Sequence, residues 1–191
     1  MNDADFVVLD TETTGLDHND QIVEIAVVDS EGRTLVNERI RPSVEIDPEA
    51  EIVHGIGMDT LTDAPQWLDI EDKVKAALAG NQVVIFNAGF DMRLLQQTIE
   101  SFIPARTPIA EYDEAVCWLH GLNVTCAMNM AARCYGATNR YGSISLVDAA
   151  WRAGIEFQGR AHSAAGDAAT TAALWRAMDS IKQCTYASCW E

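Results

Sequence analysis

The segment Phe6-Val7-Val8-Leu9-Asp10-Thr11-Glu12-Thr13-Thr14-Gly15 joins an apolar run to two carboxylates near the start of the chain. The apolar run is typical of a buried strand over residues 6–10. Residues i and i+2 of a strand point to the same face, so Asp10 and Glu12 should project side by side. Like charges at that distance repel unless a cation lies between them, and divalent ions prefer carboxylate oxygens. The segment therefore predicts a metal site, and a solvated surface pair is the alternative.

The bulk composition fits a single globular domain. The chain has 191 residues, of which 48% are hydrophobic, enough for a sizeable core. No apolar run approaches the ~20 residues of a membrane span, and we expect neither a targeting segment nor a membrane partner. The five cysteines are an odd number without the spacing of a metal knuckle. They favour reduced thiols and a cytoplasmic location, with an extracellular disulfide scaffold as the alternative.

The formal net charge of −16 bears on the choice of partner. Binding to phosphate backbones usually requires a basic surface, so this balance predicts weak non-specific affinity for nucleic acid. Bound divalent ions would cancel part of the negative charge. Charge and a metal site together favour an enzyme that holds one end of a strand over a protein that coats a duplex.

Strand patterns come first in the sequence, and helical patterns dominate its second half. Strands are predicted over residues 6–10, 22–29, 34–40 and 83–86, with another within 106–113. Helices are predicted over residues 48–53, 65–78, 89–102, 114–119, 126–135, 144–153 and 163–181. The first three strands read as an antiparallel meander, so the α/β fold class with a mixed sheet flanked by helices is expected. We expect one domain over residues 1–182 and a peripheral C-terminal tail over 183–191.

A second acidic position follows the strand predicted over residues 83–86. The sequence Val83-Val84-Ile85-Phe86-Asn87-Ala88-Gly89-Phe90-Asp91 runs from a strand through a glycine turn into a helix. Asp91 then lies in the first helical turn. Taken alone, the pattern is better explained by ordinary helix capping by Asn87 and a favourable acid at the helix start.

A third motif precedes the last helix, in Gly159-Arg160-Ala161-His162-Ser163-Ala164-Ala165-Gly166-Asp167. Five positions separate His162 from Asp167, so the two would not share one helix face. They converge only if His162 lies on the loop before the helix. The alternative is a Ser163 cap, a solvated Asp167 and an isolated loop imidazole.

Together the three motifs resemble those of the DnaQ-like 3′→5′ exonucleases of the DEDDh class, which includes proofreading subunits, oligoribonuclease and ribonuclease T. The segment Ile52-Val53-His54-Gly55-Ile56 resembles a further motif of that family. The resemblance runs from about Phe6 to Met178. Two departures are that Phe86 stands where many relatives have histidine, and that residues 112–160 match loosely.

The resemblance implies a ribonuclease H-like fold with a five-stranded mixed sheet. It implies that two Mg²⁺ or Mn²⁺ ions are held by Asp10, Glu12, Asp91 and Asp167, in a two-metal arrangement with ions ~4 Å apart. His162 would be the general base, completing the catalytic set. The implied products are nucleoside 5′-monophosphates released singly from the 3′ end.

Substrate contacts also follow from the resemblance. Backbone N–H groups around Thr13 and Thr14 would meet the terminal 3′-OH, and the other substrate-binding candidates are Leu16, His54, Ile56, Asn87 and Phe90. Leu16 and Ile56 would stack on or wedge between the last bases, which predicts little base preference. Core packing is the alternative for Leu16, Ile56 and Phe90, and a solvent-exposed helix end is the alternative for His54. Phosphate-tracking and solvated-loop roles both remain open for Arg133, Arg140, Tyr141 and Arg160.

Three functions fit these motifs. The leading one is a metal-dependent exonuclease acting on the 3′ end of single-stranded or frayed DNA. The second is trimming of RNA or short oligoribonucleotides with the same acids. The third is a non-catalytic nucleic-acid-binding subunit. The presence of an acid or histidine at all five catalytic positions argues against it. Oligomerisation and membership of a polymerase complex are left open.

Overall fold

The computed structural model describes residues 6–187, with side chains described as far as residue 179. Its centre is a five-stranded sheet with the strand order β3-β2-β1-β4-β5. The first three strands pair antiparallel, and β4 and β5 run parallel to β1. The mixed sheet predicted from the sequence is therefore confirmed. The strands are β1 (Phe6–Thr13), β2 (Ile22–Asp29), β3 (Thr34–Arg39), β4 (Gln82–Ile85) and β5 (Asn123–Cys126).

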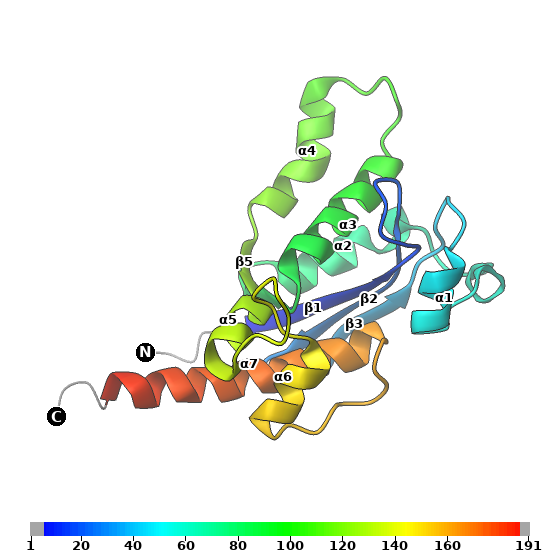
Figure 1. Ribbon diagram of the computed structural model, residues 1–191. Helices are drawn as coiled ribbons and strands as arrows, with labels where there is room; N and C mark the ends of the chain where they lie inside the picture. The colour runs from blue at the N-terminus through cyan, green and yellow to red at the C-terminus, as the bar shows by residue number, and fades with distance from the viewer. Residues whose placement is uncertain (1–5, 188–191) are drawn as a thin grey trace.

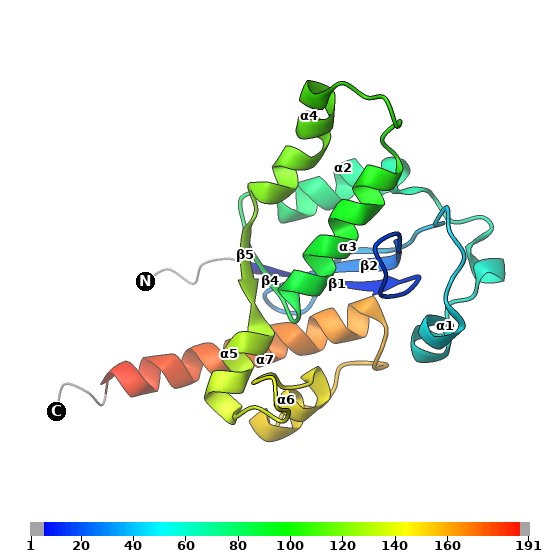
Figure 2. The same cartoon turned by 45° about the horizontal axis from the view of Figure 1, so that its top comes forward.

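Helices cover both faces of the sheet (Figures 1 and 2). Helices α2 and α3 lie on one face with α4 packed beyond them, and α5, α6 and the long α7 lie on the other. The helices are α1 (Pro48–His54), α2 (Trp67–Leu78), α3 (Ala88–Ser101), α4 (Ile109–His120), α5 (Ala127–Tyr135), α6 (Leu146–Ala153) and α7 (Ala164–Ala187), with a 3₁₀ turn η1 (Met58–Leu61). None of the helices within the described residues combines the length and apolar character needed to cross a membrane.

Alternation along β1 divides the core into two layers. Val7 and Leu9 pack with α2 and α3, whereas Val8 packs with α7 on the opposite face. Burying each such side chain contributes about 1.5–3 kcal/mol of transfer free energy, so the register of β1 is strongly specified. Asp10 and Glu12 continue the Val8 face, and both carboxylates are thereby directed toward α7.

One predicted strand is wrong. Residues 106–113 contain no strand, because α4 already begins at Ile109. The fifth strand is β5, which pairs in parallel with β4, and Gln82 donates a 3.0 Å side-chain hydrogen bond to Thr125. A strand of four residues is too short for a periodic signal. Pairing with β4 defines β5, and that contact is not visible in the local sequence.

Two boundaries also differ from the prediction. β1 continues to Thr13 because Thr11 and Glu12 pair with Ile25 and Glu24 of β2, so the acids lie within a paired strand. Helix α7 extends past residue 181 to Ala187, and the first part of the expected tail is helical. Residues 188–191 of that tail lie outside the described part of the chain.

Candidate metal centre and active site

Three carboxylates meet between β1 and α7. Oxygen atoms of Asp10, Glu12 and Asp167 all lie within 4.8 Å of one another. β1 supplies the first two, and the first turn of α7 supplies the third. Ala164, Ala168 and Ala172 line the sheet-facing side of α7 and are fully buried, so small side chains occupy the contact between helix and sheet. Residues separated by more than 150 positions are thus brought to one point.

Asp91 approaches the same strand from α3 on the other face of the sheet. Its residue is 4% exposed, and its Oδ1 accepts a 2.8 Å hydrogen bond from the Thr11 hydroxyl. Its charge is also the largest coulombic contribution that raises the pKa of Asp10. All four acids implied by the sequence motifs therefore cluster around β1, with Asp91 outside the tight group of three.

Burial and mutual repulsion leave these acids with a strong affinity for protons in the absence of a cation. Burial, followed by the charges of Asp91, Asp167 and Glu12, holds the pKa of Asp10 well above its usual range. Burial and the charge of Asp167 raise the pKa of Glu12 to about 8. Burial raises the pKa of Asp91 to about 7, although the Thr11 hydrogen bond opposes that shift. Burial likewise raises the pKa of Asp167, against the opposing effect of the His162 backbone hydrogen bond.

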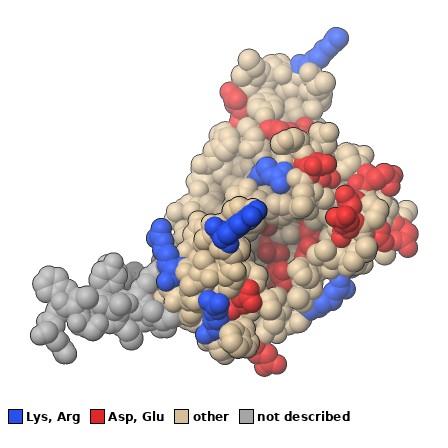
Figure 3. Space-filling model, viewed as in Figure 1, with Lys and Arg blue, Asp and Glu red and all other residues tan. Residues whose placement is uncertain are grey.

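This donor set fits divalent cations. Hard ions such as Mg²⁺ and Mn²⁺ take carboxylate oxygens, and a cation would relieve the repulsion that raises the four pKa values. Figure 3 shows acidic side chains in a recess near the centre of one face, with basic side chains at several points on the surrounding surface. Asp10, Glu12 and Asp167 are partly exposed to solvent, whereas Asp91 is buried.

His162 lies on the loop before α7, as convergence with Asp167 requires. Its side chain is exposed, and its backbone N–H donates a 3.2 Å hydrogen bond to Oδ1 of Asp167. Its φ of 59° lies in the left-handed region, which is uncommon for residues other than glycine. Such strain is often found at functional sites, where the surrounding structure maintains it. The loop thus places an imidazole beside an acid of the cluster.

His54 and Ile56 are buried and make their contacts inside the protein. The Nδ1 atom of His54 accepts the Ile56 N–H at 3.0 Å, so Nε2 carries the proton and donates to the Thr13 carbonyl at 3.1 Å. Burial lowers the pKa of His54, which agrees with this neutral ring. Ile56 is 2% exposed and packs with Val23. Both residues support the turn after β1.

Three further substrate candidates, Leu16, Phe90 and Asn87, are exposed or half-buried. Leu16 is 76% exposed on the turn after β1, and Phe90 is half-buried with the Arg93 guanidinium 5.4 Å from its ring centroid. Asn87 is exposed, and its side chain makes no capping bond to α3, which removes the simple capping interpretation. Thr13 and Thr14 are buried, and the Thr14 N–H donates a 2.8 Å hydrogen bond to the Gln21 carbonyl.

The motifs did not identify Thr11 or Glu24 as residues that support the site, and they did not predict the contact that Arg160 makes. Thr11 lies between the two acids of β1, but its hydroxyl serves Asp91 from the opposite face of the strand. Glu24 pairs with Glu12 across the sheet, and a lone acid in an apolar strand was the signal that could have identified it. Arg160 donates from Nη2 to the His54 carbonyl, and its charge lowers the pKa of Glu12. It thereby links the His162 loop to the end of α1.

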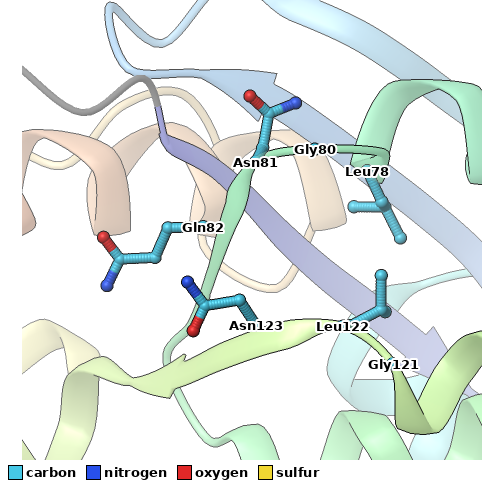
Figure 4. Close-up of a pocket in the computed structure, with 7 residues that line it drawn as sticks. All are labelled: Leu78, Gly80, Asn81, Gln82, Gly121, Leu122 and Asn123. Carbon is cyan, nitrogen blue, oxygen red and sulfur yellow. The ribbon is translucent and has the colours of Figure 1, made fainter.

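A separate hollow lies at the starts of β4 and β5, away from the acids (Figure 4). Phe6 pairs with Gln82 there, so the hollow borders the beginning of β1, whereas Asp10 and Glu12 lie further along that strand. None of its lining residues has an ionisable side chain: they are Leu78, Gly80, Asn81, Gln82, Gly121, Leu122 and Asn123. The chemistry is therefore concentrated at the acidic recess.

Comparison with known proteins agrees with this geometry. The RNase T family model, described as an exonuclease, matches residues 7–175. The uncharacterized exonuclease CP81 of Escherichia phage 186 is 34% identical over 170 residues, covering 87% of this chain and 84% of the phage protein. The DNA polymerase III subunit epsilon of Escherichia coli is 35% identical over 96 residues, which cover 45% of this chain and 40% of that subunit.

A solved structure extends the comparison to the fold. Exonuclease X, in complex with 5′ overhanging duplex DNA, superposes with a TM-score of 0.64 at 26% identity and covers 92% of both chains. The ribonuclease H-like fold and the 3′→5′ exonuclease class implied by the sequence motifs are thus confirmed. The chain belongs to the RNase T family of exonucleases.

Proposed function

We propose that this protein is a divalent-metal-dependent enzyme that removes nucleoside 5′-monophosphates from the 3′ end of single-stranded or frayed DNA. The observation that carries the proposal is the convergence of Asp10, Glu12 and Asp167 within 4.8 Å. Asp91 adjoins them through Thr11. The exonuclease X complex supports DNA as the substrate class. An acidic protein with a local anionic recess needs cations there before a phosphate can approach.

The four acids would hold two Mg²⁺ or Mn²⁺ ions. Asp10 would contribute to both ions, Glu12 and Asp167 to one of them, and Asp91 to the other. When bound, such ions supply Lewis acidity, lowering the pKa of an attacking water and stabilising charge on a leaving oxygen. The chain's own contribution is to fix the carboxylates on a strand and two helices, which limits the reorganisation needed on binding.

His162 would accept a proton from the attacking water. Water oxygen forms the new bond to phosphorus, the bond from phosphorus to the 3′ oxygen breaks, and that oxygen takes a proton from solvent. The products are a nucleoside 5′-monophosphate and a strand that ends in a new 3′-OH. His162 suits this role because its side chain is exposed while its backbone is tied to Asp167. General base catalysis of this kind contributes typically ~10²–10⁴-fold.

The terminal nucleotide would lie between the turn after β1 and the start of α3. Leu16 offers an exposed apolar side chain, and Phe90 and Asn87 offer a ring and an amide at the facing helix start. The Thr13 backbone, held by His54, would meet the 3′-OH. Stacking of this kind tolerates any base, at ~1–3 kcal/mol per base.

Cys117, Cys126 and Cys134 are free thiols, which supports a reducing, cytoplasmic location.

A single digestion experiment tests this proposal. A single-stranded DNA oligonucleotide with a 5′ fluorophore is incubated with the protein in Mg²⁺, in Mn²⁺ or in EDTA. Hydrolysis from the 3′ end gives a ladder of labelled products that shorten progressively, whereas hydrolysis from the 5′ end releases labelled mononucleotide at once. We expect the ladder with either metal and no product in EDTA, and the Asp10→Asn variant should be inactive.

Matched substrates extend the same assay. Duplex DNA with a recessed 3′ end and RNA of the same sequence are digested in parallel, and we expect single-stranded DNA to be shortened fastest. Faster digestion of RNA would replace the DNA assignment with RNA trimming. Hydrolysis that persists in EDTA or in the Asp10→Asn variant would overturn the metal-dependent mechanism. Binding of DNA without hydrolysis in any metal would instead favour a non-catalytic subunit.

A further inference from the structure

One carboxylate next to the metal centre has no role in the chemistry proposed above. Glu24 pairs with Glu12 across β1 and β2, so both side chains lie on the α7 face of the sheet. Its charge raises the pKa values of both Asp10 and Glu12. A further negative charge at this position is unfavourable for a cluster of acids. Its presence calls for a compensating interaction.

That interaction is with the first residue of α7. The Oε2 atom of Glu24 accepts a 2.9 Å hydrogen bond from the Ala164 N–H, across 140 positions of sequence. The first N–H groups of a helix have no partner within the helix, and a carboxylate there also interacts favourably with the helix dipole. The side chain of Glu24 is 12% exposed, and its Oε1 lies 3.7 Å from Nε of Arg39. The carboxylate is therefore held from two sides.

The position of the start of α7 also determines where two residues of the site lie. Asp167 lies one turn after Ala164, and His162 lies just before it. The Asp167 N–H donates to the Ser163 carbonyl at 3.0 Å, which continues the same helical turn. A shift of Ala164 would therefore move the metal-binding acid and the imidazole together. Glu24 is outside the group of acids whose oxygens lie within 4.8 Å of one another.

We propose that Glu24 is a positioning residue that fixes the start of α7 on the sheet and thereby aligns Asp167 and His162 with the acids of β1. This inference rests on the proposed metal-dependent function. Outer partners of metal ligands typically change metal affinity or activity about 10- to 100-fold when they are removed. The hydrogen bond, rather than the charge of Glu24, is the essential feature.

Two variants separate these contributions. Glu24→Gln keeps an oxygen acceptor for the Ala164 N–H but removes the charge, and Glu24→Ala removes both. Glu38→Ala is the matched control, because Glu38 pairs with Lys73 of α2 on the other face of the same sheet. Three quantities are measured: hydrogen exchange of the Ala164 amide in metal-free protein, Mn²⁺ affinity by electron paramagnetic resonance, and turnover at saturating Mn²⁺.

We expect faster Ala164 exchange and an Mn²⁺ dissociation constant raised about tenfold in Glu24→Ala, with lower turnover. Glu24→Gln should restore most of each property, and Glu38→Ala should match the wild type. The inference would be overturned if Glu24→Ala had the same Ala164 amide exchange rate and the same Mn²⁺ affinity as the wild type. Weak Mn²⁺ binding in Glu24→Gln with a protected Ala164 amide would also overturn it, because the charge would then be the essential feature.

Failure of the proposed function has a different signature. The wild-type protein itself would then bind no Mn²⁺ and hydrolyse no strand. The Ala164 exchange rates of the two Glu24 variants would still decide whether this side chain holds the start of α7.

Discussion

The Thr11 hydroxyl donates a 2.8 Å hydrogen bond to Oδ1 of Asp91, so the strand that carries two acids of the cluster also orients the acid from α3. Thr11 points to the opposite face of β1 from Asp10 and Glu12. One short stretch of β1 therefore organises carboxylates on both sides of the sheet. That arrangement makes Thr11 a direct test of how Asp91 contributes.

Replacing Thr11 with valine should impair metal use more than folding. The lost hydrogen bond costs about 1 kcal/mol of stability, and Asp91 then holds its proton more strongly because Thr11 opposes the rise in its pKa. We expect the Mg²⁺ concentration for half-maximal activity to rise about tenfold. The control is Thr171→Val, because the buried Thr171 hydroxyl has no hydrogen-bond partner among the described residues. An unchanged Mg²⁺ requirement in Thr11→Val would show that Asp91 does not depend on this contact.

The stability of the metal-free protein should fall as pH rises. Glu12 titrates at about 8 in the folded protein against an ordinary value of 4.5, and Asp91 at about 7 against 3.8. At pH values between the unfolded and the folded pKa of each group, the folded state binds more protons than the unfolded chain. The contribution of these groups to the free energy of unfolding therefore decreases as the pH rises. Mg²⁺ should therefore raise Tm more at about pH 8 than at about pH 5, where protons compete with it.

Thermal unfolding in EDTA and in Mg²⁺ across this range measures both effects. The Glu12→Gln variant is the control, because its metal-free stability should lose part of the pH dependence. An Mg²⁺-induced rise in Tm that is the same at every pH would contradict the assigned protonation of the cluster.

Removing the His162 side chain should remove most of the turnover while leaving metal binding intact. The bond from residue 162 to Asp167 is made by the backbone N–H, which every substitution except proline retains. We expect His162→Asn, which tolerates the left-handed backbone, and His162→Ala to lose about 10²–10⁴-fold in kcat. Mn²⁺ titration should give wild-type affinity for both variants. A loss of Mn²⁺ affinity in both variants would assign His162 to metal binding instead.

Gly166 should be intolerant of even one added methyl group. A Cβ at this position would lie 2.5 Å from the Arg160 carbonyl oxygen and 2.8 Å from that of Gln158. The loop carrying His162 would have to move, so Gly166→Ala should lower stability by about 1–3 kcal/mol and reduce turnover. Gly89→Ala is the matched control for stability, since a Cβ there meets nothing within 4 Å and alanine favours the helix. Equal unfolding midpoints for the two variants would contradict this packing.

The sequence was sufficient to predict the positions where chemistry and periodicity coincide. Asp10 and Glu12 come directly after a continuous apolar run, and Asp91 and Asp167 lie in the first turns of α3 and α7. The family resemblance then supplied the expectation that they converge. No local pattern alone would bring residue 167 to residue 10.

What the sequence did not reveal depends on contacts between distant segments. β5 exists through its pairing with β4, and the roles of Glu24 and Arg160 depend on bonds to Ala164 and His54. His54 shows the converse, because a motif residue implied to contact substrate has both ring nitrogens bonded inside the protein. Spacing identifies such residues as candidates, but only the fold shows which atoms remain available.

A crystal structure of the protein with Mn²⁺ and a nucleoside 5′-monophosphate would show whether the four acids bind metal at the site of hydrolysis. Anomalous scattering locates manganese independently of any assumption about its ligands. We expect manganese bound to Asp10, Glu12 and Asp167, with Asp91 on a second ion and the phosphate of the nucleotide beside them. Manganese bound elsewhere, with these four carboxylates free of metal in an active enzyme, would contradict this expectation.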